Sequence, residues 1–304
     1  MIRLISGNDI LHTEMKNIDE IRSGDVKSIA RAISQIENEA VGYEDILKEL
    51  PDNTHCGVIG ITGPPGAGKS TLTDKLIELL LKDDKRVAVL CIDPSSPFHS
   101  GAILGDRIRM SSWYKNPNVY IRSLASRGIL GGLHPNMIEI TDLLRSANFD
   151  YIIIETIGVG QNEIEISGLA DVTVVVLVPE SGDDIQMMKS GIMEIADIFV
   201  VNKADRPDAG HFAKDIINAN QINSEKQIPV IKTVAKDNIG IDELASEIKT
   251  RLLAMDEEKR LKLLSEKAYQ LIVRKNIRKI DKKEIYRKIK ESGERNIYKI
   301  TEQF

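Results

Sequence analysis

Seven short apolar runs constrain the fold of this chain more than any other feature. Most are continuously apolar and rich in β-branched residues: GVIGIT, RVAVLCID, VYIRSL, YIIIET, VTVVVLV, IFVVNK and PVIKTV. Strands of this kind are typical of parallel sheets that helices cover on both faces. Helix-length amphipathic stretches such as KSTLTDKLIELLLKDD lie between them. The alternation predicts an α/β fold, with a doubly wound, mainly parallel sheet.

Helical extensions are expected at both ends of this sheet domain. Before it, Ile21, Ile29, Ile33 and Ile36 recur at helix spacing between charged residues. After it, the chain becomes densely charged and keeps a helical pattern. We therefore expect an N-terminal helical extension over residues 1–55, the α/β domain over 56–250 and a C-terminal helical arm over 251–304.

Composition narrows the classes of partner. The 304 residues carry a net charge of -5, so the chain has no general attraction to nucleic acid or to anionic membranes. Its two cysteines, Cys56 and Cys91, lie in apolar runs and are expected to be reduced and buried. The first residues do not resemble a secretory signal, and no apolar run reaches the ~18 residues of a membrane span. We expect a cytoplasmic protein without nucleic-acid or membrane partners. His134 lies in a glycine-rich segment, where it is either near a switch or, as loop histidines usually are, exposed.

A phosphate-binding loop follows the first strand. The segment GPPGAGKS matches the pattern Gly-x-x-x-x-Gly-Lys-Ser between an apolar strand and an amphipathic helix. Its glycines let backbone N–H groups surround phosphate oxygens, and the helix N-terminus adds partial positive charge. We expect Lys69 to contact the β- and γ-phosphates and Ser70 to bind Mg²⁺. The expected phosphate-binding residues are Gly63, Pro64, Pro65, Gly66, Ala67, Gly68, Lys69, Ser70 and Thr71.

A second motif, Asn-Lys-Ala-Asp, indicates guanine as the base. The carboxylate of Asp205 can accept from both the N1–H and the 2-amino group of guanine, donors that adenine does not present there. Asn202 can connect this loop to the phosphate loop, and the stem of Lys203 can lie along the base. A final loop, Val234, Ala235 and Lys236, can offer a backbone N–H to the guanine carbonyl, although many GTPases have serine at its first position. The expected ligands are GTP and GDP.

Carboxylates at strand ends are candidates for the magnesium side of the site. Glu155 ends the strand YIIIE, where Ras-like GTPases have aspartate, and we expect it to act on Mg²⁺ through water. Asp93 ends a second strand, where α/β sheets bind ligands. Asp106 lies in a glycine-containing segment and is either a further metal-side carboxylate or a helix cap. Gln161 either orients the attacking water or makes a structural hydrogen bond, and no general base is evident.

Together these motifs resemble the MeaB/ArgK-type GTPases. The stretches that carry the resemblance include GITGPPGAGKSTL, DPSSP, SGAILGDRIRM, ETIGVGQNE, SGDDIQMMKSGIMEIAD and VNKAD, and it extends from about residue 21 to 244. The resemblance implies a homodimer with helical arms, and GTP hydrolysis that gates cofactor loading and protects an adenosylcobalamin-dependent acyl-CoA mutase. It also implies that residues 182–189 form an additional switch loop, a segment that is equally well explained as a helix start.

Two other functions remain open from the sequence. One is a metal-insertion GTPase, a class that usually carries His or Cys clusters. The other is an ATP-dependent kinase of an amino-acid transport system, which the Asn-Lys-Ala-Asp motif argues against. The charged C-terminal runs are by default a solvated helix face, with a dimer arm as the alternative that the resemblance favours.

Overall fold

The computed structural model describes residues 18–51, 55–93, 110–125, 133–158, 165–179, 192–223, 227–278 and 280–302. All seven strands expected from the apolar runs are present. They are β1 (Gly57–Thr62), β2 (Val87–Asp93), β3 (Val119–Ala125), β4 (Tyr151–Glu155), β5 (Val172–Leu177), β6 (Ile198–Val201) and β7 (Val230–Lys232). The helices before residue 256 include α2 (Val26–Glu37), α3 (Tyr43–Lys48), α4 (Lys69–Lys82), α6 (Met137–Arg145), α9 (Ile192–Ile195), α10 (Ala209–Asn223) and α11 (Ile241–Leu253), with short turns η1 (Ser111–Trp113), η2 (Ile166–Gly168) and η3 (Ala235–Asp237).

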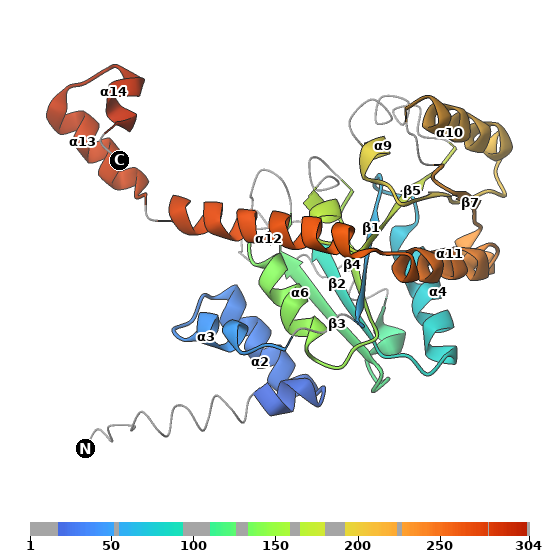
Figure 1. Cartoon of the computed structure of the whole chain (residues 1–304). Coiled ribbons are helices and arrows are strands. Elements are labelled where there is room, and N and C mark those ends of the chain that lie inside the picture. Colours follow the sequence, from blue (N-terminus) through green and yellow to red (C-terminus); the bar gives the residue numbers. More distant parts are fainter. Residues whose placement is uncertain are drawn as a thin grey trace. The chain divides into compact units, whose positions relative to one another are not determined.

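The seven strands form one sheet in the order β3-β2-β4-β1-β5-β6-β7, and every neighbouring pair runs parallel (Figure 1). β1 lies between β4 and β5. The chain builds β2 to β4 on one side of β1 and then β5 to β7 on the other. The connections therefore diverge on either side of β1, and ligands bind at such a point outside the carboxyl ends of the strands. The doubly wound parallel fold expected from the sequence is confirmed.

The strands are apolar throughout because alternate residues face two different helical layers. Val174 and Val176 of β5 belong to a buried cluster that includes Leu76 of α4. Their neighbour Val175 belongs to a second cluster, with Ile216 of α10. A polar residue on either face would thus be removed from water without a partner.

The N-terminal helices are part of the same compact unit as the sheet, which comprises residues 1–255. α2 packs against α6, and α3 contacts both of them (Figure 1). The side-chain amide of Asn136 donates to the carbonyl of Ile36 at the end of α2, with 2.6 Å between nitrogen and oxygen. Arg122 of β3 forms an ion pair with Glu37. These contacts attach the extension to the β3 edge of the sheet.

The expectation that His134 is exposed is wrong, because only 2% of this residue is accessible to solvent. Its Nδ1 atom accepts a hydrogen bond from the backbone N–H of Asn136, at 3.2 Å. The turn that precedes α6 lies against the end of α2, to which Asn136 is hydrogen-bonded. The burial of His134 could not be predicted from a glycine-rich loop sequence, because it depends on this contact between distant segments.

Residues 256–304 form a second compact unit made of helices, α12 (Glu257–Ile277), α13 (Lys282–Ser292) and α14 (Ile297–Thr301). Each helix begins at a polar cap whose side chain accepts from a backbone N–H of the first turn: Asp256, Asp281 and Asn296. Within the described residues, no helix is both long enough and apolar enough to cross a membrane.

Candidate functional site

The phosphate loop has the strand–loop–helix geometry that its sequence predicts. It leaves β1 at Thr62 and enters α4 at Lys69. Gly63 has φ 136°, and a Cβ atom there would lie 2.0 Å from the carbonyl oxygen of Val176. Gly68 has φ 90°, and its added Cβ would lie 2.3 Å from the side-chain nitrogen of Asn202. Both positions therefore require glycine, because a side chain would displace neighbours on which the site is built.

Lys69 is buried at the start of α4, with 6% of the residue exposed. Its ammonium group donates to the carbonyl oxygens of Gly63 at 2.8 Å, Pro64 at 2.9 Å and Ile157 at 3.3 Å. The first two belong to the phosphate loop and the third to the segment that follows β4. Lys69 thus connects the loop to that segment, and its positive charge lies among backbone groups at the carboxyl end of the sheet.

The carboxylate of Glu155, at the end of β4, lies against the helix that follows the phosphate loop. Its Oε1 accepts from the Ser70 hydroxyl at 2.5 Å, and its Oε2 accepts from the Thr73 hydroxyl at 2.9 Å. Glu155 is 3% exposed and Thr73 is completely buried. The structure therefore brings together Ser70 and Glu155, two residues that the sequence assigned to the metal side. Thr73 was missed, although its spacing of three residues from Ser70 places the two hydroxyls on one helix face.

A buried pair of hydroxyls joins the ends of β1 and β4. Thr62 and Thr156 are hydrogen-bonded through their Oγ1 atoms at 2.8 Å, and both are at most 2% exposed. The backbone N–H of Thr156 also donates to the carbonyl of Ile61 at 3.1 Å. The start of the phosphate loop and the residue after Glu155 are thus held together by side-chain and backbone bonds.

Asn202, 3% exposed, joins the second motif to the phosphate loop. Its Nδ2 atom donates to the carbonyl of Ala67 at 2.8 Å. Its Oδ1 atom accepts from the Thr233 hydroxyl at 3.0 Å and from the backbone N–H of Ala235 at 3.2 Å. The connection expected from the sequence is present, and it extends to the loop after β7. One amide side chain therefore ties together three loops that are distant in sequence.

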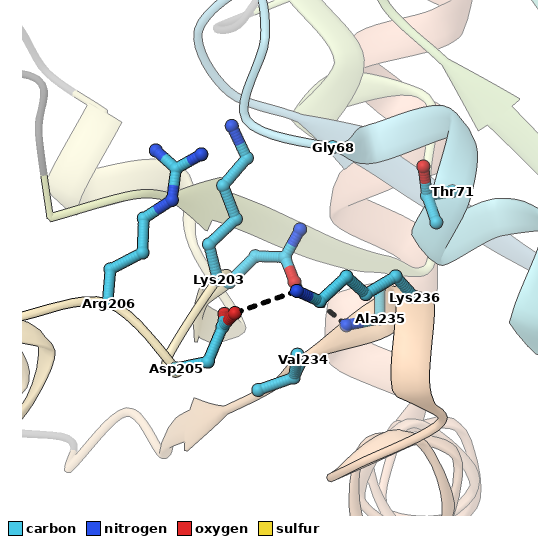
Figure 2. Close-up of a pocket in the computed structure, with 9 residues that line it drawn as sticks. Gly68, Thr71, Lys203, Asp205, Arg206, Val234, Ala235 and Lys236 are labelled. Carbon is cyan, nitrogen blue, oxygen red and sulfur yellow. Dashed lines mark hydrogen bonds and ion pairs between the residues drawn. The ribbon is translucent and has the colours of Figure 1, made fainter.

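Asp205 and Lys236 face each other across the outer part of the site (Figure 2). The Lys236 ammonium lies 2.9 Å from Asp205 Oδ2. This hydrogen bond lowers the pKa of the Asp205 carboxyl below its usual value and raises the pKa of Lys236. The Asp205 side chain remains 40% exposed. It is therefore an ionised, accessible acceptor, the state needed to accept from two donors of a purine.

A pocket of about 160 Å³ opens between the two motifs. Figure 2 shows it between Gly68 and Thr71 of the phosphate-loop side and the residues of the two outer loops. The backbone of Lys203 is left-handed, with φ 56°, and its side chain extends along the pocket (Figure 2). The lining residues are Gly68, Thr71, Asn202, Lys203, Asp205, Arg206, Val234, Ala235 and Lys236. All but Arg206 were singled out from the sequence, and Arg206 carried no signal beyond its place next to Asp205.

The remaining sequence-predicted residues fall into two groups. Pro65 and Gly66 are exposed at the tip of the phosphate loop, and Ala67 is buried beneath it. Asp93 is the last residue of β2, at the carboxyl end of a parallel strand, as expected. The Asp93 side chain, Asp106, Gln161 and the proposed switch segment 182–189 lie outside the described residues.

Comparison with known proteins identifies the family. The family model for the methylmalonyl-CoA mutase-associated GTPase MeaB matches residues 29–292. A Pyrococcus abyssi protein provisionally named a GTPase is 44% identical over 252 residues, covering 81% of this chain and 78% of the relative. The fused isobutyryl-CoA mutase of Geobacillus kaustophilus is 34% identical over 235 residues, which are 72% of this chain and 22% of that protein.

The solved structures agree in fold. The crystal structure of a LAO/AO transport system kinase superposes with a TM-score of 0.66 at 24% identity and covers 99% of this chain and 97% of its own. At this identity the likeness concerns the fold alone. The chain belongs to the methylmalonyl-CoA mutase-associated GTPase MeaB family and is a GTPase.

Proposed function

We propose that this GTPase binds GTP and GDP across the two joined motifs. The phosphates lie on residues 63–71, and the base lies against Lys203 with its donors on Asp205. The backbone N–H groups of the loop formed by residues 234–236 complete the base site. The observation that supports the proposal most directly is the hydrogen bonding of Asn202. Its side chain joins the loop that contains Asp205 to the phosphate loop, and both loops line the same pocket.

We propose that Mg²⁺ is held on the Ser70 and Glu155 side of the phosphate loop. The donor set fits this ion, because a hydroxyl and a carboxylate supply hard oxygen atoms and Mg²⁺ keeps waters and phosphate oxygens for its other positions. Their hydrogen bond of 2.5 Å places both beside the start of α4. Asp93 and Asp106 remain candidates for the same side. When bound, the ion would neutralise charge on the terminal phosphates.

The chain's own groups then have separate tasks in hydrolysis. Lys69 and the loop N–H groups stabilise negative charge on the transferred phosphoryl group. Gly158 lies against the loop so closely that an added Cβ would be 2.0 Å from the Gly63 carbonyl oxygen and 2.6 Å from Lys69 Nζ. Gly158, three residues after the end of β4, therefore lies directly against the phosphate loop. Gln161 follows it in sequence and is our candidate for orienting the attacking water.

We further propose that the nucleotide state gates cofactor loading and protection of an adenosylcobalamin-dependent acyl-CoA mutase. Two observations support a mutase partner: the family is described as mutase-associated, and a relative exists as a fusion with an acyl-CoA mutase. The homodimer, with helical arms from residue 251 onward, is part of the same proposal.

The test is association with the mutase subunits of the same host. Purified full-length chain is mixed with them in the presence of GDP or a non-hydrolysable GTP analogue, and complexes are separated by size. We expect association that differs between the two nucleotides and that Asp205→Asn weakens. Asp237→Asn is the matched control, since Asp237 also lies near Lys236, at 4.0 Å, and is not part of the pocket lining.

If the chain associates with the mutase equally in both nucleotides, or not at all, the proposed gating role is refuted. The proposed nucleotide site would not be affected by that result. Binding of ATP as tight as that of GTP would instead favour the transport-kinase hypothesis. Tight binding of a transition metal by the purified chain would favour the metal-insertion hypothesis.

A further inference from the structure

Thr73, one turn into α4, places a polar hydroxyl group in the buried core of the domain. It is completely buried, in the helix face that packs against the sheet. Its hydroxyl donates to Glu155 Oε2 at 2.9 Å, across 82 residues of sequence. A buried hydroxyl that donates to a carboxylate rather than to its own helix backbone has a specific partner, because threonine in a helix otherwise bonds a carbonyl of the preceding turn.

The two oxygens of Glu155 are held by two hydroxyls of the same helix. Ser70 and Thr73 are three residues apart and therefore neighbours on one face of α4. Ser70 takes Oε1 at 2.5 Å and Thr73 takes Oε2 at 2.9 Å. The plane of the carboxylate is thereby fixed, and the oxygen on the Ser70 side is the one directed toward the phosphate-loop end of the helix.

The backbone beside Glu155 is fixed independently. Ile61 of β1 is the partner of Glu155 in the parallel register. The next residue, Thr156, is bonded to the Ile61 carbonyl and to the Thr62 hydroxyl. The Glu155 side chain has one more rotatable bond than the aspartate found there in Ras-like GTPases. It therefore has more rotamer freedom to lose when Ser70 and Thr73 hold its two oxygens.

We propose that Thr73 is a positioning residue that holds the carboxylate of Glu155 for Mg²⁺. This inference rests on the magnesium side of the proposed function. Thr73 does not touch the nucleotide or the metal. Thr73 compensates for the extra methylene of the glutamate by donating to Oε2, the oxygen that Ser70 does not bind. Glu155 then presents one orientation to the metal side whether or not a nucleotide is bound.

The experiment measures how Mg²⁺ slows the release of a fluorescent GDP from the full-length chain. We expect Thr73→Val to raise the Mg²⁺ concentration for half-maximal retention about tenfold, the worth of one hydrogen bond to a charged group. In excess chelator, GDP release should equal that of the wild type. Thr73→Ser, which keeps the hydroxyl, should restore the wild-type Mg²⁺ response.

Thr141→Val is the matched control. Thr141 is also completely buried in a helix, but its hydroxyl donates to the Met137 carbonyl of α6 at 2.7 Å. The same chemical change there should leave the Mg²⁺ response unaltered. If Thr73→Val is too unstable to purify, Thr73→Cys keeps a side chain of similar size with a weak donor and serves in its place.

A double-mutant cycle separates positioning from packing. In a Glu155→Ala background, which has no side-chain acceptor for the Thr73 hydroxyl, Thr73→Val should have no further effect on the Mg²⁺ response, whereas a packing defect would persist. A folded Thr73→Val protein with the wild-type Mg²⁺ response overturns the inference. If Mg²⁺ does not slow GDP release from the wild-type chain, the proposed magnesium site itself is refuted.

Discussion

Replacing Asp205 by asparagine tests guanine recognition, because it replaces one carboxylate oxygen by an NH₂ group with almost no change of shape. The carboxylate lies 2.9 Å from Lys236 and is accessible in the pocket. An asparagine keeps one acceptor oxygen but turns an NH₂ group toward the same place. Guanine presents donors there, so the substitution leaves at least one donor of the base facing another donor.

The expected loss follows from the charge state of Asp205. The Lys236 hydrogen bond lowers the pKa of this carboxyl, so that it is ionised throughout the neutral range. A hydrogen bond to an ionised group changes an equilibrium by about 10- to 100-fold. We therefore expect Asp205→Asn to weaken GDP and GTP binding by at least about tenfold. Because the pKa of Asp205 is lowered, this carboxylate should stay ionised until the pH falls below its ordinary value of 3.8.

The assay is calorimetric titration with GDP and with its 2-oxo analogue, xanthosine diphosphate. The asparagine NH₂ can donate to the carbonyl that xanthine carries in place of the amino group, so the variant should prefer the analogue over GDP. Asp237→Asn removes an equal charge near the same lysine and should bind GDP as the wild type does. A gain for the analogue cannot arise from misfolding.

The reasoning would be refuted by an Asp205→Asn protein that binds GDP within about twofold of the wild type. Equal losses in Asp205→Asn and Asp237→Asn would also contradict it, because they would trace the effect to the charge around Lys236 and not to contact with the base.

Three further outcomes are expected from the geometry. Gly68→Ala should weaken GDP binding at least about tenfold in the same calorimetric assay, because its Cβ would meet Asn202 Nδ2 at 2.3 Å and its backbone is left-handed. Arg145→Ala should lower the free energy of unfolding in urea by about 3 kcal/mol, because it removes the positive charge that binds both oxygens of the buried Asp171 carboxylate. Burial raises the pKa of the Cys56 thiol to about 12 from 9.0. The free energy of unfolding should therefore fall above pH 9 by up to about 1.4 kcal/mol per pH unit, and Cys56→Ala should remove that part of the decline.

Local pattern was enough to predict the elements of the sheet. Each of the seven apolar runs is a strand, because a run that is apolar on both faces can be buried only between two helical layers. The start of α4 at Lys69 was likewise predictable, since a glycine-rich turn between strand and helix has few alternative structures. The strand order and the packing of α2 on α6 were not predictable from such runs, because they depend on contacts between distant segments.

The side-chain contacts inside the site divide in the same way. Asn202 was assigned its connection from sequence because the motif places an amide at a strand end beside the phosphate loop. Its acceptance from Thr233 was not foreseen, and neither was the pairing of Thr62 with Thr156. Hydroxyl groups at these positions carry no pattern of their own, since threonine is equally common as a strand former.

The sequence by itself determined that this chain is a parallel α/β protein with a phosphate loop and a guanine-type motif, since both are encoded in residues close together along the chain. Only the tertiary structure decided how Glu155 is oriented, by bringing Ser70 and Thr73 against it across more than 80 residues. It also decided that Asp205 meets Lys236 at 2.9 Å, from loops 31 residues apart. The physical reason is that such bonds depend on where the sheet places its strand ends, and that is settled by packing the whole core.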